Sequence, residues 1–296
     1  MATIADEKIT IPSLQSRKGS GPRIVCLTAY DYPTARILDE SGVVDLILVG
    51  DSLGMVMLGY PNTVPVTMDE MIHHTKAVTR AVRRALVVGD MPYFSFHLSA
   101  DETVRNASRF LKEAGAAAVK IEGASAKRLK LVAAMVEAEI PVMGHVGLTP
   151  QSINRYGRFR VKGTAAGEAA RIVEDAVALE EAGAFAIILE SMPIEVAAMV
   201  TKAVGVPTIG IGAGPACDGQ VLVLHDMLGY STGYMPKFVR KFADINGVIR
   251  GAVEAYAAEV RDGAFPDDAT SYHLKPEVAS ELRRAKPASR RSKGRR

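Results

Sequence analysis

The sequence predicts an α/β fold, a single (β/α)8 TIM barrel, on three observations. Short runs that are apolar on both faces, such as Val44–Val49, alternate along the chain with amphipathic helical segments, and such runs are typical of parallel strands. Several of them end abruptly in polar residues, as at Asp51-Ser52, and parallel α/β folds gather their ligand chemistry at the carboxyl ends of strands. The alternation continues without a second change of pattern, which favours a closed barrel over an open doubly wound sheet.

The first half of the barrel is predicted from four apolar runs and the helices between them. Thr67 is followed three residues later by Glu70, the pairing of a capping box, and predicts the start of a helix. Ser41-Gly42 is a typical helix stop. The predicted strands are 23–30, 44–52, 85–92 and 116–123, and the predicted helices are 31–40, 67–84, 100–114 and 126–138.

The second half contains three further clear runs and a weakly marked eighth strand. We assign the eighth strand to the short segment Ser231–Met235. The segment between Thr149 and Gly163 is rich in Gln, Asn, Gly and Arg, lacks periodicity and is too long for an ordinary βα loop, which predicts a lid. The remaining predicted strands are 141–148, 185–191 and 207–213, and the helices are 165–182, 194–203 and 243–262.

Length and composition predict a protein that folds around one large core. The chain has 296 residues, of which 48% are hydrophobic and 23% charged, enough for one large domain. Its first residues lack the apolar core of a secretion signal, and no apolar run reaches the roughly 18 residues of a membrane span. Cys26 and Cys217 lie far apart and predict neither a metal cluster nor a disulfide. We therefore expect a cytoplasmic protein without a membrane partner.

The positive net charge of +3 belongs to the C-terminal tail. Lys275–Arg296 holds nine Lys or Arg against two Glu, which leaves 27 basic and 31 acidic residues before position 275. A Pro-, Ser- and Arg-rich end of this kind is typical of a solvated extension. We divide the chain into an N-terminal extension (1–21), a catalytic barrel (22–273) and a basic, disordered tail (274–296), with nucleic-acid binding by the tail as an alternative.

Three acids close three successive predicted strands. Asp51, Asp90 and Glu122 would face one another around the barrel mouth, where close carboxylates repel one another unless a cation or protons intervene. Oxygen ligands favour a hard divalent ion such as Mg²⁺. The alternative is that each acid only caps the helix that follows. We predict that the three acids together form a metal site.

Lys120 and His145 also fall at strand ends. Lys120 and Glu122 are two residues apart, so their side chains point to the same side of a strand. An inward lysine needs a partner, either a structural carboxylate or an anionic substrate. His145 on the next strand is either a satisfied core histidine or a member of the same ring of functional residues.

Two features close the later strands. Glu190 ends an aliphatic strand, a setting that favours the neutral acid and suits a general base, with a salt bridge to an arginine as the alternative. The run Gly210-Ile-Gly-Ala-Gly214 resembles half of a dinucleotide fingerprint, but glycines at the end of a late barrel strand also form phosphate-binding or backbone turns.

A set of motifs occurs in order over about residues 5–273. The motifs are Leu27-Thr-Ala-Tyr-Asp-Tyr32, Val49-Gly-Asp-Ser-Leu-Gly-Met55, His74, Val119-Lys-Ile-Glu-Gly123, Gly144-His-Val-Gly-Leu-Thr-Pro-Gln-Ser152, Gly210-Ile-Gly-Ala-Gly214 and Asp218-Gly-Gln-Val-Leu222. As a set they resemble the ketopantoate hydroxymethyltransferase family, also called 3-methyl-2-oxobutanoate hydroxymethyltransferase. The resemblance implies a (β/α)8 barrel, usually a homodecamer. It also implies transfer of a hydroxymethyl group from 5,10-methylenetetrahydrofolate to 3-methyl-2-oxobutanoate with Mg²⁺, giving ketopantoate for pantothenate synthesis.

The resemblance also assigns roles to the candidate residues. Asp51, Asp90 and Glu122 match the family's metal site, and Glu190 matches its catalytic base. The positions that match its oxoacid-binding residues are Asp51, Ser52, Asp90, Lys120 and His145. Two departures stand out: Arg158 replaces a second glycine of the 149–163 loop, and the basic tail is an addition. The first leaves closure of the loop an open question.

Two rival functions remain. One is a Mg²⁺-dependent oxoacid lyase of the isocitrate lyase and phosphoenolpyruvate mutase type, which also polarises small oxoacids on a metal held by carboxylates. This reading gives no reason for the Val-Gly-Asp-Ser and His-Val-Gly-Leu-Thr-Pro motifs. The other is a nucleic-acid-binding barrel that acts through the tail, for which salt-dependent binding would be the sign.

Overall fold

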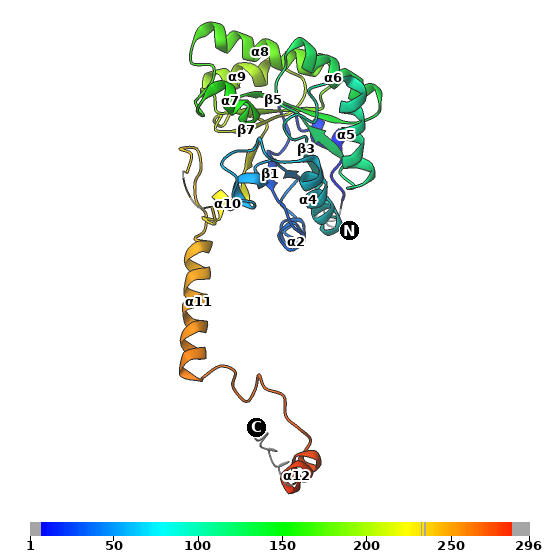
Figure 1. Ribbon diagram of the computed structural model, residues 1–296. Helices are drawn as coiled ribbons and strands as arrows, with labels where there is room; N and C mark the ends of the chain where they lie inside the picture. The colour runs from blue at the N-terminus through cyan, green and yellow to red at the C-terminus, as the bar shows by residue number, and fades with distance from the viewer. Residues whose placement is uncertain (1–6, 232, 234, 286–296) are drawn as a thin grey trace, which may run out of the picture. The chain divides into compact units, whose positions relative to one another are not determined.

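A computed structural model describes residues 7–231, 233 and 235–285 of the chain (Figure 1). It divides into two compact units, Met1–Asp244 and Ile245–Arg296. The first unit contains the barrel and every candidate site residue. Each unit is described by itself.

The first unit is built on a closed barrel of eight parallel strands in the order β1 to β8, which confirms the predicted fold class. All carboxyl ends of the strands therefore meet at one mouth. The strands are β1 (Ile24–Thr28), β2 (Leu46–Val49), β3 (Leu86–Asp90), β4 (Ala118–Lys120), β5 (Val142–Gly147), β6 (Ala186–Glu190), β7 (Thr208–Ile211) and β8 (Gly219–Leu222). The helices are α1 (Ile11–Gln15), α2 (Tyr32–Glu40), α3 (Leu53–Val56), α4 (Met68–Ala81), α5 (Ala100–Lys112), α6 (Ala126–Glu137), α7 (Ile153–Tyr156), α8 (Ala166–Glu181), α9 (Ile194–Ala203) and α10 (Leu224–Met227), with a 3₁₀ turn at Pro150–Ser152.

The eighth strand corrects one prediction. β8 is Gly219–Leu222, which pairs with β7 on one side and β1 on the other. The segment Ser231–Met235 does not supply it: its described residues 231, 233 and 235 are not in a strand, and 232 and 234 lie outside the described residues. The error has a physical cause, because a four-residue strand with an outward glutamine and a glycine lacks the apolar run that marks its neighbours.

Alternate residues of each strand form two hydrophobic cores. On β2, Leu46 and Leu48 join the cluster that fills the barrel interior, whereas Ile47 and Val49 pack in the shell between strands and helices. This alternation follows from the period of two in a strand. Helix α4 begins as predicted, because Thr67 and Glu70 form a complete capping box at its start.

The N-terminal segment closes the amino end of the barrel. Ile9 and Leu14 are buried among the interior side chains, and the ammonium of Lys18 lies 2.9 Å from Oδ2 of Asp218. Asp218 in turn accepts a hydrogen bond from the backbone N–H of Thr208 at 2.8 Å. The described part of the predicted extension is therefore packed into the barrel unit.

Asp39 at the end of α2 holds the turn that leads into β3. Its buried carboxylate accepts hydrogen bonds from the backbone N–H groups of Arg83, Arg84 and Ala85 at 2.7–3.2 Å. Among the described residues, no backbone acceptor of a helix or strand serves these three donors. Because buried donors without acceptors are costly, this single side chain stabilises the connection.

The substitution Asp39→Asn is expected to lower the free energy of unfolding by about 2 kcal/mol, because a neutral amide replaces a charged acceptor and turns a donor toward three donors. Urea unfolding followed by circular dichroism would measure the change. Glu40→Gln is the matched control, since Glu40 is exposed in an i,i+4 pair with Arg36. A shift in Asp39→Asn no larger than in this control would contradict the assignment.

The second unit contains α11 (Ile245–Asp262) and α12 (Pro276–Arg284), which have no buried residues. The division at 244/245 differs from the barrel boundary expected at 273. Residues 276–284 of the predicted disordered tail form a helix. A proline and Glu277 in its first turn and Arg283 and Arg284 in its last turn suit a solvated helix. Residues 286–296 lie outside the described residues. Within the described part of the chain, the helices fall short of the length and hydrophobicity that a membrane crossing demands.

Candidate active site

The predicted site residues lie at the carboxyl ends of β2 to β6, side by side at the barrel mouth. Parallel pairing aligns neighbouring strand ends directly: Asp90 is the register partner of Lys120, and Glu190 is the register partner of Gly147, two residues beyond His145. Residues from distant parts of the chain are therefore brought into contact by the sheet alone.

The three acids that close β2, β3 and β4 are buried, with 5%, 2% and 5% of Asp51, Asp90 and Glu122 exposed. The backbone N–H of Asp51 donates to Oδ2 of Asp90 at 3.2 Å. Lys120 lies between the other two, with its ammonium 2.7 Å from Oδ1 of Asp90 and 3.9 Å from Oε1 of Glu122. Lys120 therefore has carboxylate partners within the protein, as the first of the two interpretations of this lysine predicts.

His145 connects this cluster to Glu190. Its Nδ1 lies 3.5 Å from the Lys120 ammonium and 3.7 Å from Oε1 of Glu122, and its Nε2 lies 3.3 Å from Oε2 of Glu190. His145 is buried, whereas 16% of the Glu190 side chain is exposed. Glu190 is therefore the member of the group that a substrate can approach from the mouth.

Acidic side chains outnumber basic ones in the buried cluster. Burial, and then the neighbouring Asp90 carboxylate, raise the pKa of Asp51 to about 7. Burial also raises the pKa of Glu122 well above its ordinary value, against the opposing effect of Lys120. Burial disfavours the charge on Lys120, but the surrounding acids, Asp90 foremost, raise its pKa and keep it protonated. Such a site gains free energy by binding a further cation.

His145 contributes a neutral ring. Burial, together with the nearby Lys120 ammonium, lowers the pKa of His145. A neutral imidazole carries one N–H and one acceptor nitrogen. It can therefore orient a polar group in the site without adding another positive charge.

Ser52 lies beside the acids but is held differently. Its hydroxyl forms a 2.8 Å hydrogen bond with the phenol of Tyr30, whose side chain is buried behind β1. Burial, foremost among its causes, raises the pKa of Tyr30, so this phenol stays protonated. Tyr30 adjoins the site through Ser52. The pattern of polar residues at strand ends does not identify it, although it lies inside the motif Leu27–Tyr32.

Gln151 is a second residue that sequence reasoning did not single out. Its side-chain amide donates to Oδ2 of Asp51 at 3.0 Å and to the carbonyl of Met91 at 2.9 Å. Its backbone N–H donates to Oε2 of Glu122 at 3.1 Å. The predicted lid is thus attached to two of the site acids. In the sequence, the only indication of a role for Gln151 is an amide side chain near the start of the long polar loop 149–163.

Arg158 does not strain the lid in which it replaces a glycine. Gly157 ends α7 in the left-handed region with φ of +71°, and Arg158 is not among the described residues with positive φ. An arginine is therefore compatible with this backbone.

The donor set fits a hard divalent cation that keeps part of its shell for other ligands. Among the described residues, no group of three or more His, Cys, Asp or Glu is arranged as a ready metal cage. Mg²⁺, however, is usually held by one or two carboxylates and completes its shell with water and substrate oxygens. Asp51 and Asp90 adjoin, and the Lys120 ammonium, 2.7 Å from Oδ1 of Asp90, offsets only part of their negative charge. These two acids fit such an ion, with Glu122 nearby.

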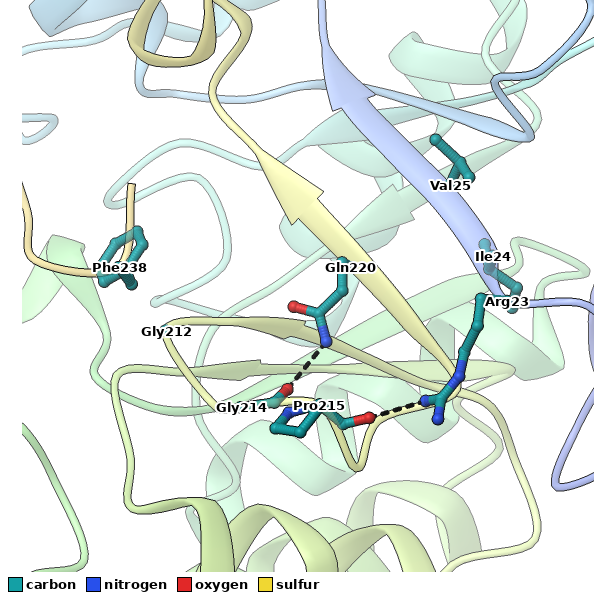
Figure 2. A pocket seen from close by; sticks show the side chains of 8 residues that line it. All are labelled: Arg23, Ile24, Val25, Gly212, Gly214, Pro215, Gln220 and Phe238. Atoms are coloured by element: carbon teal, nitrogen blue, oxygen red, sulfur yellow. Dashed lines mark hydrogen bonds between the residues drawn. The ribbon is translucent and has the colours of Figure 1, made fainter. Parts of the chain in front are cut away.

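A separate pocket of about 590 Å³ lies beside the start of β1, the residues that follow β7, and β8, and none of the site acids lines it (Figure 2). Figure 2 shows Gln220 donating to the carbonyl of Gly214 and Arg23 donating to the carbonyl of Pro215. Gln220 is thus paired with the last glycine of the run, and Arg23 with the proline that follows it. The run therefore shapes a turn here, and this observation favours the backbone reading over a dinucleotide motif.

Fold and site together define a (β/α)8-barrel enzyme with a buried cluster of carboxylates and one lysine at its mouth. The sequence profile described as Ketopantoate hydroxymethyltransferase matches residues 8–268, and the chain belongs to that family. Its activity is hydroxymethyl transfer that forms ketopantoate.

Curated relatives support this placement. The 3-methyl-2-oxobutanoate hydroxymethyltransferase of Koribacter versatilis (strain Ellin345) is 54% identical over 275 residues, which are 93% of this chain and 92% of that protein. The protein of the same name from Syntrophomonas wolfei is 54% identical and covers 93% of this chain and 99% of its own length.

Solved structures share the fold at much lower identity. Phosphonopyruvate hydrolase in complex with oxalate and Mg²⁺ has a TM-score of 0.58 at 18% identity, covering 92% of this chain and 95% of that one. A 2,3-dimethylmalate lyase of the phosphoenolpyruvate mutase and isocitrate lyase superfamily has a TM-score of 0.55 at 16% identity, covering 95% of each chain. At this identity the likeness concerns the fold.

Proposed function

We propose that the mouth cluster binds Mg²⁺ and 3-methyl-2-oxobutanoate and transfers the one-carbon unit of 5,10-methylenetetrahydrofolate to the oxoacid. The observation that carries this proposal is the cluster of side chains at one barrel mouth. Asp90, which adjoins Asp51, is paired with the Lys120 ammonium, and His145 links this group to the more exposed Glu190. We assign Asp51 and Asp90 to the metal, with Glu122 nearby. A bound Mg²⁺ would polarise the oxoacid as a Lewis acid.

Lys120, Ser52 and His145 are assigned to the oxoacid. The Lys120 ammonium supplies a fixed positive charge for the keto oxygen, on which negative charge develops when C3 loses its proton. Neutral His145 and the Ser52 hydroxyl supply hydrogen bonds that orient the carboxylate and keto groups. Because these groups are held by buried neighbours, they need little rearrangement during the reaction.

Glu190 is assigned the base. It lies at the open side of the cluster, beside neutral His145, and removes the C3 proton of the oxoacid. The resulting carbanion forms a bond to the methylene carbon, and both carbon–nitrogen bonds of the folate bridge break. Water supplies the hydroxyl group of the product, and the proton from C3 and the second proton of water end on the two folate nitrogens. Glu122 and the other acids remain fixed by hydrogen bonds and by Lys120.

The family also suggests assembly and location. We propose that the chain forms a homo-oligomer, a decamer by analogy with the family, and that it works in the cytoplasm. Its two cysteines are free and buried, in agreement with a reducing compartment. We assign no nucleic-acid partner.

The expected result of the defining assay is ketopantoate formation only when oxoacid, methylenetetrahydrofolate and Mg²⁺ are all present. Product analysis by mass spectrometry with single omissions would measure it, and ¹³C in the folate methylene should appear in the product. Cleavage of an oxoacid without folate would instead favour the lyase alternative, which the solved structures suggest by fold alone.

A further inference from the structure

The loop that carries α7 is fixed to the site at both of its ends. Gln151 precedes it and bonds to Asp51 and Glu122. At the other end, the backbone N–H of Lys162 donates to the carbonyl of Ser191, the residue after Glu190, at 2.8 Å. Residues 153–162, here called the arginine segment, therefore span the mouth from the metal-binding acids to the proposed base.

The arginine segment is strongly basic on its outer side. Arg155, Arg158 and Arg160 are exposed, and residues 149–166 contain no acid. Within the described part of the chain, none of the three guanidinium groups forms a hydrogen bond or an ion pair. Three cations thus lie on one short loop without neutralisation, although the barrel body as a whole has more acids than bases.

Lys162 adds a buried cation to the same segment. Only 6% of this residue is exposed, and its ammonium lies 3.5 Å from the centre of the Tyr156 ring. Among the described residues no carboxylate pairs with it. A cation–π contact compensates part of the lost hydration of a buried ammonium. A bound anion would compensate the remainder.

We propose that the arginine segment binds the glutamate carboxylates of the folate co-substrate. This inference rests on the proposed folate-dependent function. The reacting methylene carbon must reach Glu190 and the oxoacid, while the glutamate end of a folate is the part most distant from that carbon and the part that carries negative charge. The basic arginine segment next to the acidic cluster of the barrel mouth matches this distribution of charge along the folate.

The chemistry of the segment suits that end of the molecule. Arginine presents a planar fork that binds carboxylates with two hydrogen bonds. Phe159, which is 43% exposed, lies between Arg158 and Arg160 in sequence and offers a face to the benzoyl ring that precedes the glutamate. Each additional glutamate of a polyglutamate adds one carboxylate, so the affinity should rise with tail length.

The test compares monoglutamate and triglutamate forms of methylenetetrahydrofolate as donors for the full chain with Mg²⁺ and saturating oxoacid. An exposed ion pair contributes up to about a factor of five, so we expect the triglutamate KM to be about tenfold lower than the monoglutamate KM. In the triple variant Arg155→Gln, Arg158→Gln, Arg160→Gln the ratio should fall to about two. Isothermal titration calorimetry with the monoglutamate and triglutamate forms of tetrahydrofolate would measure the same difference in affinity without turnover.

The matched control removes three exposed cations elsewhere on the barrel. Arg80, Arg105 and Lys130 are exposed on α4, α5 and α6 and form no ion pair among the described residues. Their triple replacement by glutamine should leave the tenfold ratio in place. In the wild type, raising the salt concentration from about 0.05 M to about 0.5 M should shrink the ratio, because salt screens exposed charges.

Three results would overturn the inference. Equal KM values for both donors in the wild type would do so, as would a ratio that survives in the triple variant. A triple variant that raises the KM of the oxoacid and keeps the donor ratio would assign the segment to the other substrate. Absence of product with either donor would remove the proposed function together with this inference, whereas product with equal KM values removes the inference alone.

Discussion

Glu190→Gln is expected to lower the turnover number by about 10²–10⁴-fold, the range that a positioned general base contributes. Glutamine keeps the size of the side chain and its position beside Nε2 of His145, but it cannot take a proton. Oxoacid and Mg²⁺ should still bind. The measurement is exchange of the C3 hydrogen in D₂O without folate, followed by NMR, which isolates proton removal from methylene transfer.

A suitable control for this substitution is Glu137→Gln, which removes an exposed acid on α6. It should exchange the C3 hydrogen at the wild-type rate. If Glu190→Gln exchanged as fast as this control, another group would be the base, and Glu190 would have only a binding or structural part in the site.

Asp90→Asn is expected to weaken Mg²⁺ binding by about 10- to 100-fold and to abolish turnover, because the site loses one of the two adjoining acids proposed as ligands. In the wild type, Mg²⁺ affinity should rise with pH through about 7, the pKa of Asp51, and level off once Asp51 has released its proton. The sign follows because the protonated acid cannot serve as a ligand. Isothermal titration calorimetry between about pH 5.5 and 8.5 would measure both effects.

A second, independent result is expected for Asp90→Asn. Asp90 is the second cause, after burial, of the raised pKa of Asp51, so its neutralisation should move the midpoint of the pH dependence to lower pH. Circular dichroism should show an unchanged fold. Wild-type Mg²⁺ affinity in Asp90→Asn at pH 8 would remove Asp90 from the metal site.

Seven strands and most helices could be predicted because their signals are local. The β2 run is apolar on both faces, and the capping box of α4 has both its residues in place. The prediction of the eighth strand was wrong because a short strand with little apolar surface has no local signal. β8 is identified by its pairing with β7 and β1, which closes the barrel. Residues 276–284 form a helix within the tail for which a Pro-, Ser- and Arg-rich composition predicts a disordered extension, because composition does not distinguish a solvated helix from a disordered chain.

The candidate site was predictable to the extent that strand ends converge by topology. Asp51, Asp90 and Glu122 could be placed at one mouth from the alternation alone. Gln151 could not be, because its role depends on a loop that folds back over the acids, and no periodicity describes such a loop. The same holds for Tyr30, whose phenol reaches Ser52 from an adjacent strand.

The fold class, the family and the chemical character of the mouth follow from the sequence alone, because apolar periodicity, helix caps and residue types at strand ends are local properties. How the site residues share their charges depends on the folded structure. It places the Lys120 ammonium between Asp90 and Glu122, and it leaves Glu190 as the accessible acid. Burial and distance between residues remote in sequence set these interactions, since electrostatic energies depend on both.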